Sequence, residues 1–146
     1  DMLAENELPA LSFRAEVTES QIMEDAETAK EVFENLRQRR VLLHMDDFGK
    51  GYSSLSYLVR FHIDTLKIDG SFVSNMNVRG ENFEIIRMIV TLAKNLGMKV
   101  VAEGIETENQ LEQLKKLKCE YGQGFYLQRP VPPEDIEKRW LASPSA

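Results

Sequence analysis

Cysteine and histidine are scarce in this sequence. Cys119 is the only cysteine, and His44 and His62 are the only histidines. An internal disulfide is therefore excluded, and so is a zinc cluster with the usual spacing of cysteines and histidines. If this chain binds a metal, oxygen atoms must hold it.

Long apolar runs are missing as well, and basic residues are outnumbered. No tract is long enough to cross a bilayer and no signal-peptide pattern is visible, so we expect a cytoplasmic segment without membrane contact. A longer parent protein could still carry a membrane anchor. The formal charge is −6, because 18 basic residues face 24 acidic ones. This balance argues against DNA as a partner, and an anionic ligand would need a local cation.

The residues that are present suit an ordinary globular protein. The 146 residues are 42% hydrophobic and 29% charged, which is enough to bury one core. We therefore expect a single domain or part of a larger one.

Strand and helix patterns alternate along the chain. The expected strands cover residues 11–17, 41–45, 65–68, 99–102 and 121–127, and the expected helices cover 22–36, 53–59, 83–96, a stretch opened by Thr107, and 135–141. Gly97 suits a left-handed C-cap, and Thr107 with Gln110 forms a capping-box signature. About five parallel strands alternating with helices indicate an α/β fold, either an open parallel sheet or a partial TIM-type (β/α) barrel.

Every expected strand carries a polar residue in it or at its end. In strand order these are Glu16 and Glu19, Asp46 and Asp47, Lys67 and Asp69, Glu103 and Glu106, and Gln123. Because the carboxyl ends of parallel strands meet at one face, we expect these side chains to converge. Taken singly, each could be a helix N-cap partner, a turn residue or a solvated side chain. The joint pattern favours a functional site.

Several carboxylates on one concave face repel each other and are costly to desolvate. A divalent cation relieves both effects, and ligands restricted to oxygen favour Mg²⁺, Mn²⁺ or Ca²⁺ over zinc. Adjacent aspartates suit a pair of metals bridged by one carboxylate, an arrangement that supports phosphoryl displacement. The residues therefore predict that Asp46 and Asp47 hold metal.

Five segments together resemble one known family. They are EVTES at 16–20, DDFGKGYSSLSYL at 46–58, LKIDGSFV at 66–73, VVAEGIET at 100–107 and QGFYLQRP at 123–130. In this order they resemble the EAL-domain cyclic di-GMP phosphodiesterases of bacterial signalling. The resemblance implies a (β/α) barrel that hydrolyses cyclic di-GMP to linear pGpG with Mg²⁺ or Mn²⁺ at a two-metal site.

The resemblance also implies roles for individual residues. Glu16 and Asp46 would be metal ligands, with Asp46 able to bridge, and Asp47 would serve the second metal. Lys67 would help to position or deprotonate the attacking water. Glu103 would hold the water around the second metal or act in proton transfer, and the identity of the general base stays open.

Four further residues are expected to bind substrate or shape the site. Glu19 would anchor the loop from Phe48 to Ser54, and Gln123 would complete the polar wall. Glu106 and Phe48 belong to the same matching segments.

The chain departs from the family pattern in several places. The Glu-Ala-Leu segment that names the family and a later Asn, both metal-ligand positions, are absent. A complete barrel typically needs about 250 residues, so we expect residues 1–146 to be a single incomplete EAL domain, the C-terminal part of the barrel. Lys50 stands where the family usually has Thr, Ser or Ala, and Arg14 and Ala15 precede Glu16 where apolar or acidic residues are usual.

These departures separate the complete domain from this chain alone. We expect the complete domain to be a cyclic di-GMP phosphodiesterase and the fragment to be weak or inactive. The alternative is a non-catalytic cyclic di-GMP receptor or regulatory module. Such relatives usually lose metal ligands, whereas Glu16, Asp46 and Asp47 are present here. The expected partners are cyclic di-GMP, upstream sensor or cyclase domains, and a second copy if the domain forms a homodimer.

Overall fold

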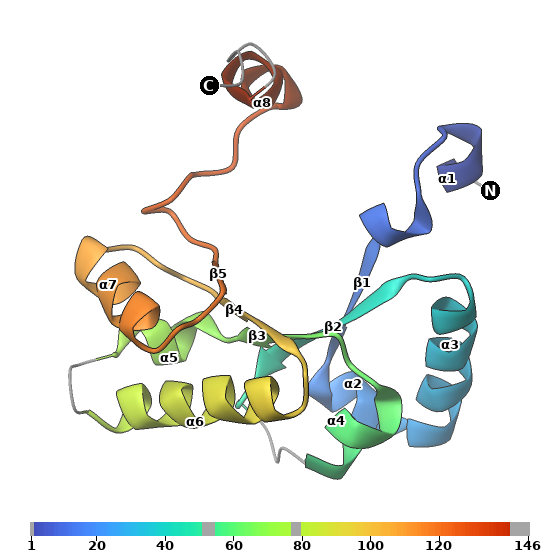
Figure 1. The fold of residues 1–146 in the computed structure, drawn as a ribbon, viewed down its shortest axis with the longest axis horizontal. Coiled ribbons are helices and arrows are strands. Elements are labelled where there is room, and N and C mark those ends of the chain that lie inside the picture. Colours follow the sequence, from blue (N-terminus) through green and yellow to red (C-terminus); the bar gives the residue numbers. More distant parts are fainter. Residues whose placement is uncertain (1, 51–54, 77–79, 141–146) are drawn as a thin grey trace.

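The computed structural model describes residues 2–50, 55–76 and 80–140. Within them, one sheet contains five strands in the order β1-β2-β3-β4-β5. The strands are β1 (Arg14–Thr18), β2 (Leu42–Phe48), β3 (Thr65–Ile68), β4 (Lys99–Ala102) and β5 (Tyr121–Gly122). Each neighbouring pair is parallel. This arrangement confirms the expected α/β fold (Figure 1).

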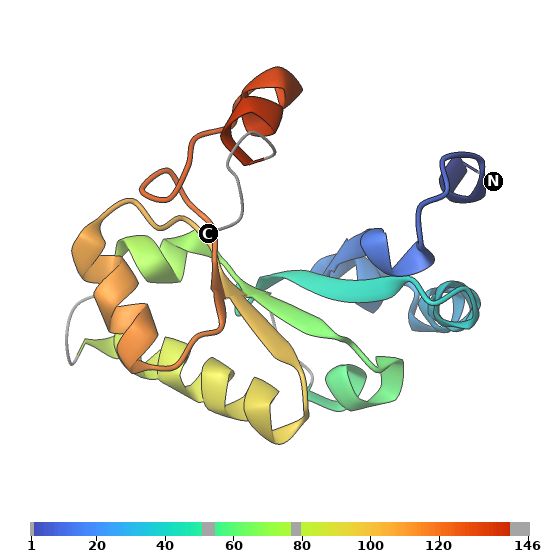
Figure 2. The same cartoon turned by 45° about the horizontal axis from the view of Figure 1, so that its top comes forward.

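Helices connect every pair of successive strands. The helical segments are α1 (Met2–Glu5), η1 (Ala10–Ser12), α2 (Glu19–Glu24), α3 (Ala26–Gln38), α4 (Leu55–Phe61), α5 (Gly70–Ser74), α6 (Glu81–Asn95), α7 (Glu108–Lys116) and α8 (Pro133–Trp140). Figures 1 and 2 show α3, α4 and α6 along one face of the sheet, whereas α1 and α8 stand apart from it. In the described part of the chain, no helix is both long and apolar enough to span a bilayer.

Two helix signals in the sequence are confirmed by the structure. Thr107 and Gln110 form the complete capping box at the start of α7. Gly97 follows α6 with a φ of 72°, a left-handed conformation that glycine adopts without a steric penalty.

The first expected strand and the helix after it are corrected by the structure. Leu11 lies in the short 3-10 turn η1, so the strand begins only at Arg14. The expected helix over 22–36 is two helices, α2 and α3. Asp25 separates them, because its side chain accepts a hydrogen bond from the Thr28 N–H and caps α3.

Other element boundaries also shift. β2 runs on to Phe48 instead of ending at Met45, and β5 ends at Gly122, because residues 124–127 form a turn. The short helix α5 was not expected. Parts of two expected helices, residues 53–54 and 141, lie outside the described residues.

The core lies between the central strands and the crossover helices. All four residues of β3 are buried, as expected for a central parallel strand. Its Leu66 and Ile68 pack in one cluster with Ile22, Met45 and Ile86. This packing fixes the backbone on which Lys67 is carried.

Candidate functional site

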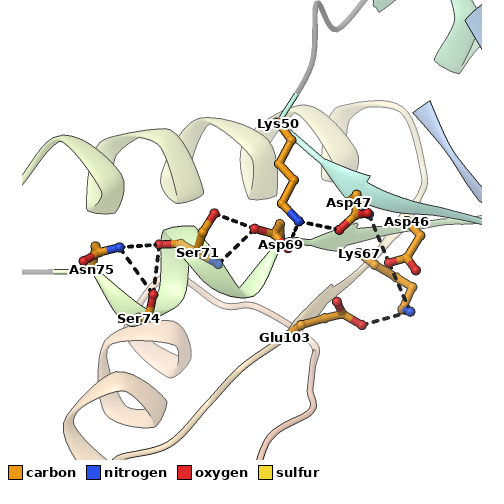
Figure 3. A network of polar contacts seen from close by, with 9 residues as sticks. All are labelled: Asp46, Asp47, Lys50, Lys67, Asp69, Ser71, Ser74, Asn75 and Glu103. Carbon is orange, nitrogen blue, oxygen red and sulfur yellow. Dashed lines mark hydrogen bonds and ion pairs between the residues drawn. The ribbon is translucent and has the colours of Figure 1, made fainter. Parts of the chain in front are cut away.

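Lys67 of β3 lies at the centre of a carboxylate cluster. Its Nζ is 2.9 Å from Glu16 Oε2 of β1, 3.2 Å from Asp46 Oδ1 of β2, and 2.9 Å from Glu103 Oε1, directly after β4. Figure 3 shows the Lys67 ammonium reaching both Asp46 and Glu103. The parallel register thus brings together side chains that are far apart in the sequence.

The Lys67 ammonium is strongly held in its charged form. Burial of the side chain, which is 8% exposed, disfavours the charge. Hydrogen bonds to Glu103, Glu16 and Asp46 outweigh this effect and raise the pKa of Lys67 above its ordinary value. In this arrangement Lys67 is therefore a hydrogen-bond donor at neutral pH.

A second charged group lies beside the first, around Lys50. Its Nζ is 2.9 Å from Asp47 Oδ1 and 2.8 Å from Asp69 Oδ2. Asp69 also caps α5, because it accepts hydrogen bonds from the N–H and the hydroxyl of Ser71 (Figure 3). Burial acts to raise the pKa of Asp69, but the bonds from Lys50 and Ser71 prevail and lower it to about 2.

The backbone of β2 explains how Asp46 and Asp47 both reach this end of the sheet. Successive residues of a regular strand point to opposite faces. The pairing of β2 with β3 shifts register between Met45 and Phe48, and Asp47 has a φ of 54°. Aspartate is one of the few residue types that adopt this left-handed conformation readily. The irregularity lets Asp46 meet Lys67 while Asp47 meets Lys50.

Glu19 and Phe48 are both buried. Glu19 is the first residue of α2, and it lines a cavity of about 140 Å³ together with Thr18, Ser20, Asp47 and Lys50. Its expected partner is the loop from Phe48 to Ser54, of which residues 51–54 lie outside the described part of the chain. The Phe48 side chain is only 4% exposed and packs in the hydrophobic core. It therefore anchors the end of β2, next to Asp47.

Gln123 directly follows β5, and Glu106 lies in the loop between β4 and α7. Both line a cavity of about 340 Å³ that also touches Asp69 and Glu103. Gln123 is located just after β5 and not within it. Its backbone is fixed, because its N–H donates to Ala102 O at 2.8 Å and its carbonyl accepts from Ile105 N at 3.1 Å.

Two contributors, Lys50 and His44, were not predicted as site residues, and Asp69 was expected at this face of the sheet without a role of its own. Nδ1 of His44 is 4.0 Å from Glu16 Oε1. Burial and the nearby Arg14 charge lower the pKa of His44. Strand periodicity could have identified His44, since residues 44 and 46 share a face of β2. The Asp-Gly-Ser sequence could have identified Asp69 as a helix cap.

The donor set suits a hard divalent cation, because Glu16, Asp46 and Asp47 offer only carboxylate oxygens. Within the described ranges, however, no group of three acidic, histidine or cysteine side chains is close enough together to hold a metal ion. In the arrangement described, the ammonium groups of Lys67 and Lys50 neutralise these carboxylates.

Comparison with known proteins identifies the family. Residues 1–130 match the EAL domain. The chain is 41% identical to cyclic di-GMP phosphodiesterase NbdA of Pseudomonas aeruginosa over 131 residues, which is 90% of this chain and 17% of NbdA. In general it spans about a fifth of the length of the curated relatives it matches.

Solved structures agree with the sequence comparison. The PaMucR phosphodiesterase in its c-di-GMP complex superposes with a TM-score of 0.86 at 42% identity, covering 92% of this chain and 54% of that one. The manganese and cyclic di-GMP complex of Klebsiella pneumoniae BlrP1 gives 0.79 at 34% identity, covering 84% of this chain and 31% of that one. This chain therefore belongs to the EAL domain family.

Proposed function

We propose that this chain is part of a domain that hydrolyses one phosphodiester bond of cyclic di-GMP to give linear pGpG. The observation that carries the proposal is the convergence of Glu16, Asp46 and Glu103 on Lys67 at the ends of successive strands. The names of the relatives support it: NbdA is a cyclic di-GMP phosphodiesterase, and the PaMucR and BlrP1 structures contain cyclic di-GMP.

Glu16, Asp46 and Asp47 would hold two divalent cations, either Mg²⁺ or Mn²⁺. The BlrP1 complex with manganese supports this choice of cation. When bound, such cations lower the pKa of water and neutralise charge at the reacting phosphate. The carboxylates contribute by fixing where that positive charge is located.

Lys67 and Glu103 would divide the remaining chemistry. Because Lys67 is charged and held by Glu16, Asp46 and Glu103, its role would be to orient the attacking water or a phosphate oxygen by donating hydrogen bonds. Glu103 is 2.9 Å from Lys67 Nζ and its side chain is 19% exposed, so it can both be positioned by the lysine and reach solvent. Glu103 is therefore our choice for the proton acceptor.

The remaining residues would shape the site. Gln123 and Glu106 would form the wall opposite Asp69, and Glu19 with Phe48 would support the loop after β2. We further propose that residues 1–146 are an incomplete EAL domain, that strands supplied from elsewhere complete the barrel and its ligands, and that this chain alone is weak or inactive. The complete protein would then act in cytoplasmic signalling, coupled to sensor or cyclase domains.

The test is to incubate cyclic di-GMP and Mn²⁺ with this chain and with a version extended upstream by about 100 residues, and to look for pGpG by chromatography. We expect product from the extended protein. In that protein, Asp46→Asn or Asp47→Asn should lower turnover by at least about a hundredfold.

Glu112→Gln is the matched control, because it removes one exposed carboxylate on α7, away from the site. It should leave turnover unchanged. Full turnover in both aspartate variants would refute the metal assignment. Binding of cyclic di-GMP without any product from either protein would instead identify a receptor.

A further inference from the structure

We propose that the ammonium group of Lys50 competes with a divalent metal ion for the Asp47 carboxylate and so weakens metal binding there. This inference rests on the proposed function, because it takes Asp47 as a metal ligand. It adds a residue that sets how much metal the site requires.

The geometry places Lys50 where a second cation would act. Its Nζ bridges Asp47 and Asp69 at 2.9 and 2.8 Å, between the ends of β2 and β3 (Figure 3). The turn holds it there, since the Lys50 N–H donates to the Asp47 carbonyl at 3.3 Å. A metal ion approaching the Asp47 carboxylate would therefore meet an ammonium that already shares its oxygen.

Exposure distinguishes the two lysines. The side chain of Lys67 is 8% exposed and is held by three carboxylates, whereas that of Lys50 is 52% exposed. The Asp47 side chain is also partly exposed, at 43%. Ion pairs at such exposed positions contribute little to stability, so Lys50 can leave Asp47 for solvent. Lys50 is thus displaceable, and displacing it takes part of the binding free energy of the incoming metal.

A role for Lys50 as a contact for substrate phosphate is less consistent with these contacts. Its ammonium is already neutralised by two carboxylates, so it offers a phosphate less net attraction than an unpaired lysine would. Once Asp47 is taken as a metal ligand, the same contacts make Lys50 a competitor of the metal ion.

The experiment measures Mn²⁺ binding to the version extended upstream by about 100 residues, by electron paramagnetic resonance without nucleotide. Lys50→Met removes the charge and keeps the length of the side chain. We expect the weaker Mn²⁺ site to bind about tenfold tighter in this variant, because repulsion between the cation and a neighbouring ammonium is lost. Lys50→Arg retains the charge and should bind as the parent does.

Two controls make the result specific. Lys115→Met removes an exposed lysine whose Nζ is 3.1 Å from the carboxylate of Glu112, three residues before it. This pair has the same sequence spacing as Lys50 and Asp47. The variant should leave Mn²⁺ binding unchanged. In an Asp47→Asn background, Lys50→Met should no longer have an effect. Lys50→Ala provides a second charge-free variant if the first does not fold.

The other outcomes are decisive in different ways. Unchanged binding in Lys50→Met would overturn this inference alone, provided that Asp46→Asn still abolishes Mn²⁺ binding. Weaker binding would also overturn it and would make Lys50 a support for Asp47. Absence of Mn²⁺ binding in the parent and in every variant would refute both this inference and the metal assignment of the proposed function.

Discussion

Asp46 and Asp47 are neighbours in the sequence, yet each is paired with a different lysine. Asp46 contacts the buried Lys67, and Asp47 contacts the exposed Lys50. The position of both carboxylates at this end of the sheet could be predicted from the sequence, because acidic residues recur at the ends of successive strands. The lysine partner of Asp47 could not, because a left-handed residue inside a strand leaves no clear pattern in the amino acids around it.

Lys67→Met tests the electrostatic role of the central lysine. It would leave Glu16, Asp46 and Glu103 close together without a cation, so we expect the free energy of unfolding to fall by about 3 kcal/mol at neutral pH. Added Mn²⁺ should restore part of the loss, since it supplies the missing positive charge. Urea denaturation with and without Mn²⁺ measures both effects. Lys67→Arg is the control, and equal losses in the two variants would show that charge is not the cause.

Asp69 predicts a specific dependence of stability on pH. Its pKa is lowered from 3.8 to about 2 in the folded protein, so its ion pair and hydrogen bonds stabilise the fold fully above pH 3.8 and lose their effect as the pH falls toward 2. Asp69→Asn should therefore cost about 2 kcal/mol at neutral pH and progressively less in this acidic range. Urea midpoints of parent and variant across the range measure the difference. A difference that is constant with pH would contradict the assignment.

At the level of elements, the ends of β3 and β4 approach each other through two glycines. A Cβ at Gly104 would lie 2.9 Å from the Cα of Gly70, and Gly104 also has a φ of 68°. Only a residue without a side chain satisfies both conditions. Because Glu103 directly precedes Gly104, this contact also sets where the Glu103 carboxylate lies.

Gly104→Ala should therefore reduce both stability and activity. The left-handed backbone alone costs about 1–2 kcal/mol, and separating the two strand ends adds to this. Gly97→Ala is the matched control, because Gly97 has a similar φ of 72° with no atom within 4 Å of the added Cβ. In the version extended upstream, we expect Gly97→Ala to lose stability only, whereas Gly104→Ala also loses pGpG formation. Equal activity in the two variants would show that the contact does not position Glu103.

The success of prediction from sequence differed among the elements for physical reasons. β3 and β4 were correct at both ends, because each is a short stretch containing β-branched and other apolar residues that is followed directly by an acidic residue, Asp69 or Glu103. α7 was correct at its start, because its capping box is a local interaction. β5 was too long, because the turn after Gly122 depends on a hydrogen bond from Tyr126 N to Ile105 O, which is distant in sequence. α5 was missed, because a five-residue helix has too few positions to show periodicity.

At the level of the whole molecule, apolar side chains remain at the two edges of the sheet. In the described part of the chain, β1 and β5 each pair with one neighbouring strand. Near them, the side chains of Phe13 and Phe125 are 50% and 52% exposed. Unpaired edges beside apolar side chains favour association with other chains.

This surface predicts how the chain behaves when it is isolated. We expect these 146 residues to bind an apolar dye and to elute at a mass that rises with concentration, whereas the version extended upstream should do neither. Size-exclusion chromatography with light scattering and dye fluorescence test this. A monomer of low dye binding from the short chain would contradict the proposal that it is an incomplete barrel.

The order of the strands in space is also their order in the chain, and this has a consequence for synthesis. A ribosome releases β1, β2, β3 and β4 one after another, so Lys67 emerges when Glu16 and Asp46 are already outside the exit tunnel. Glu16 and Asp46 can then both pair with Lys67 before the third carboxylate, Glu103, joins last. The nascent chain therefore never has to gather three bare negative charges at one point.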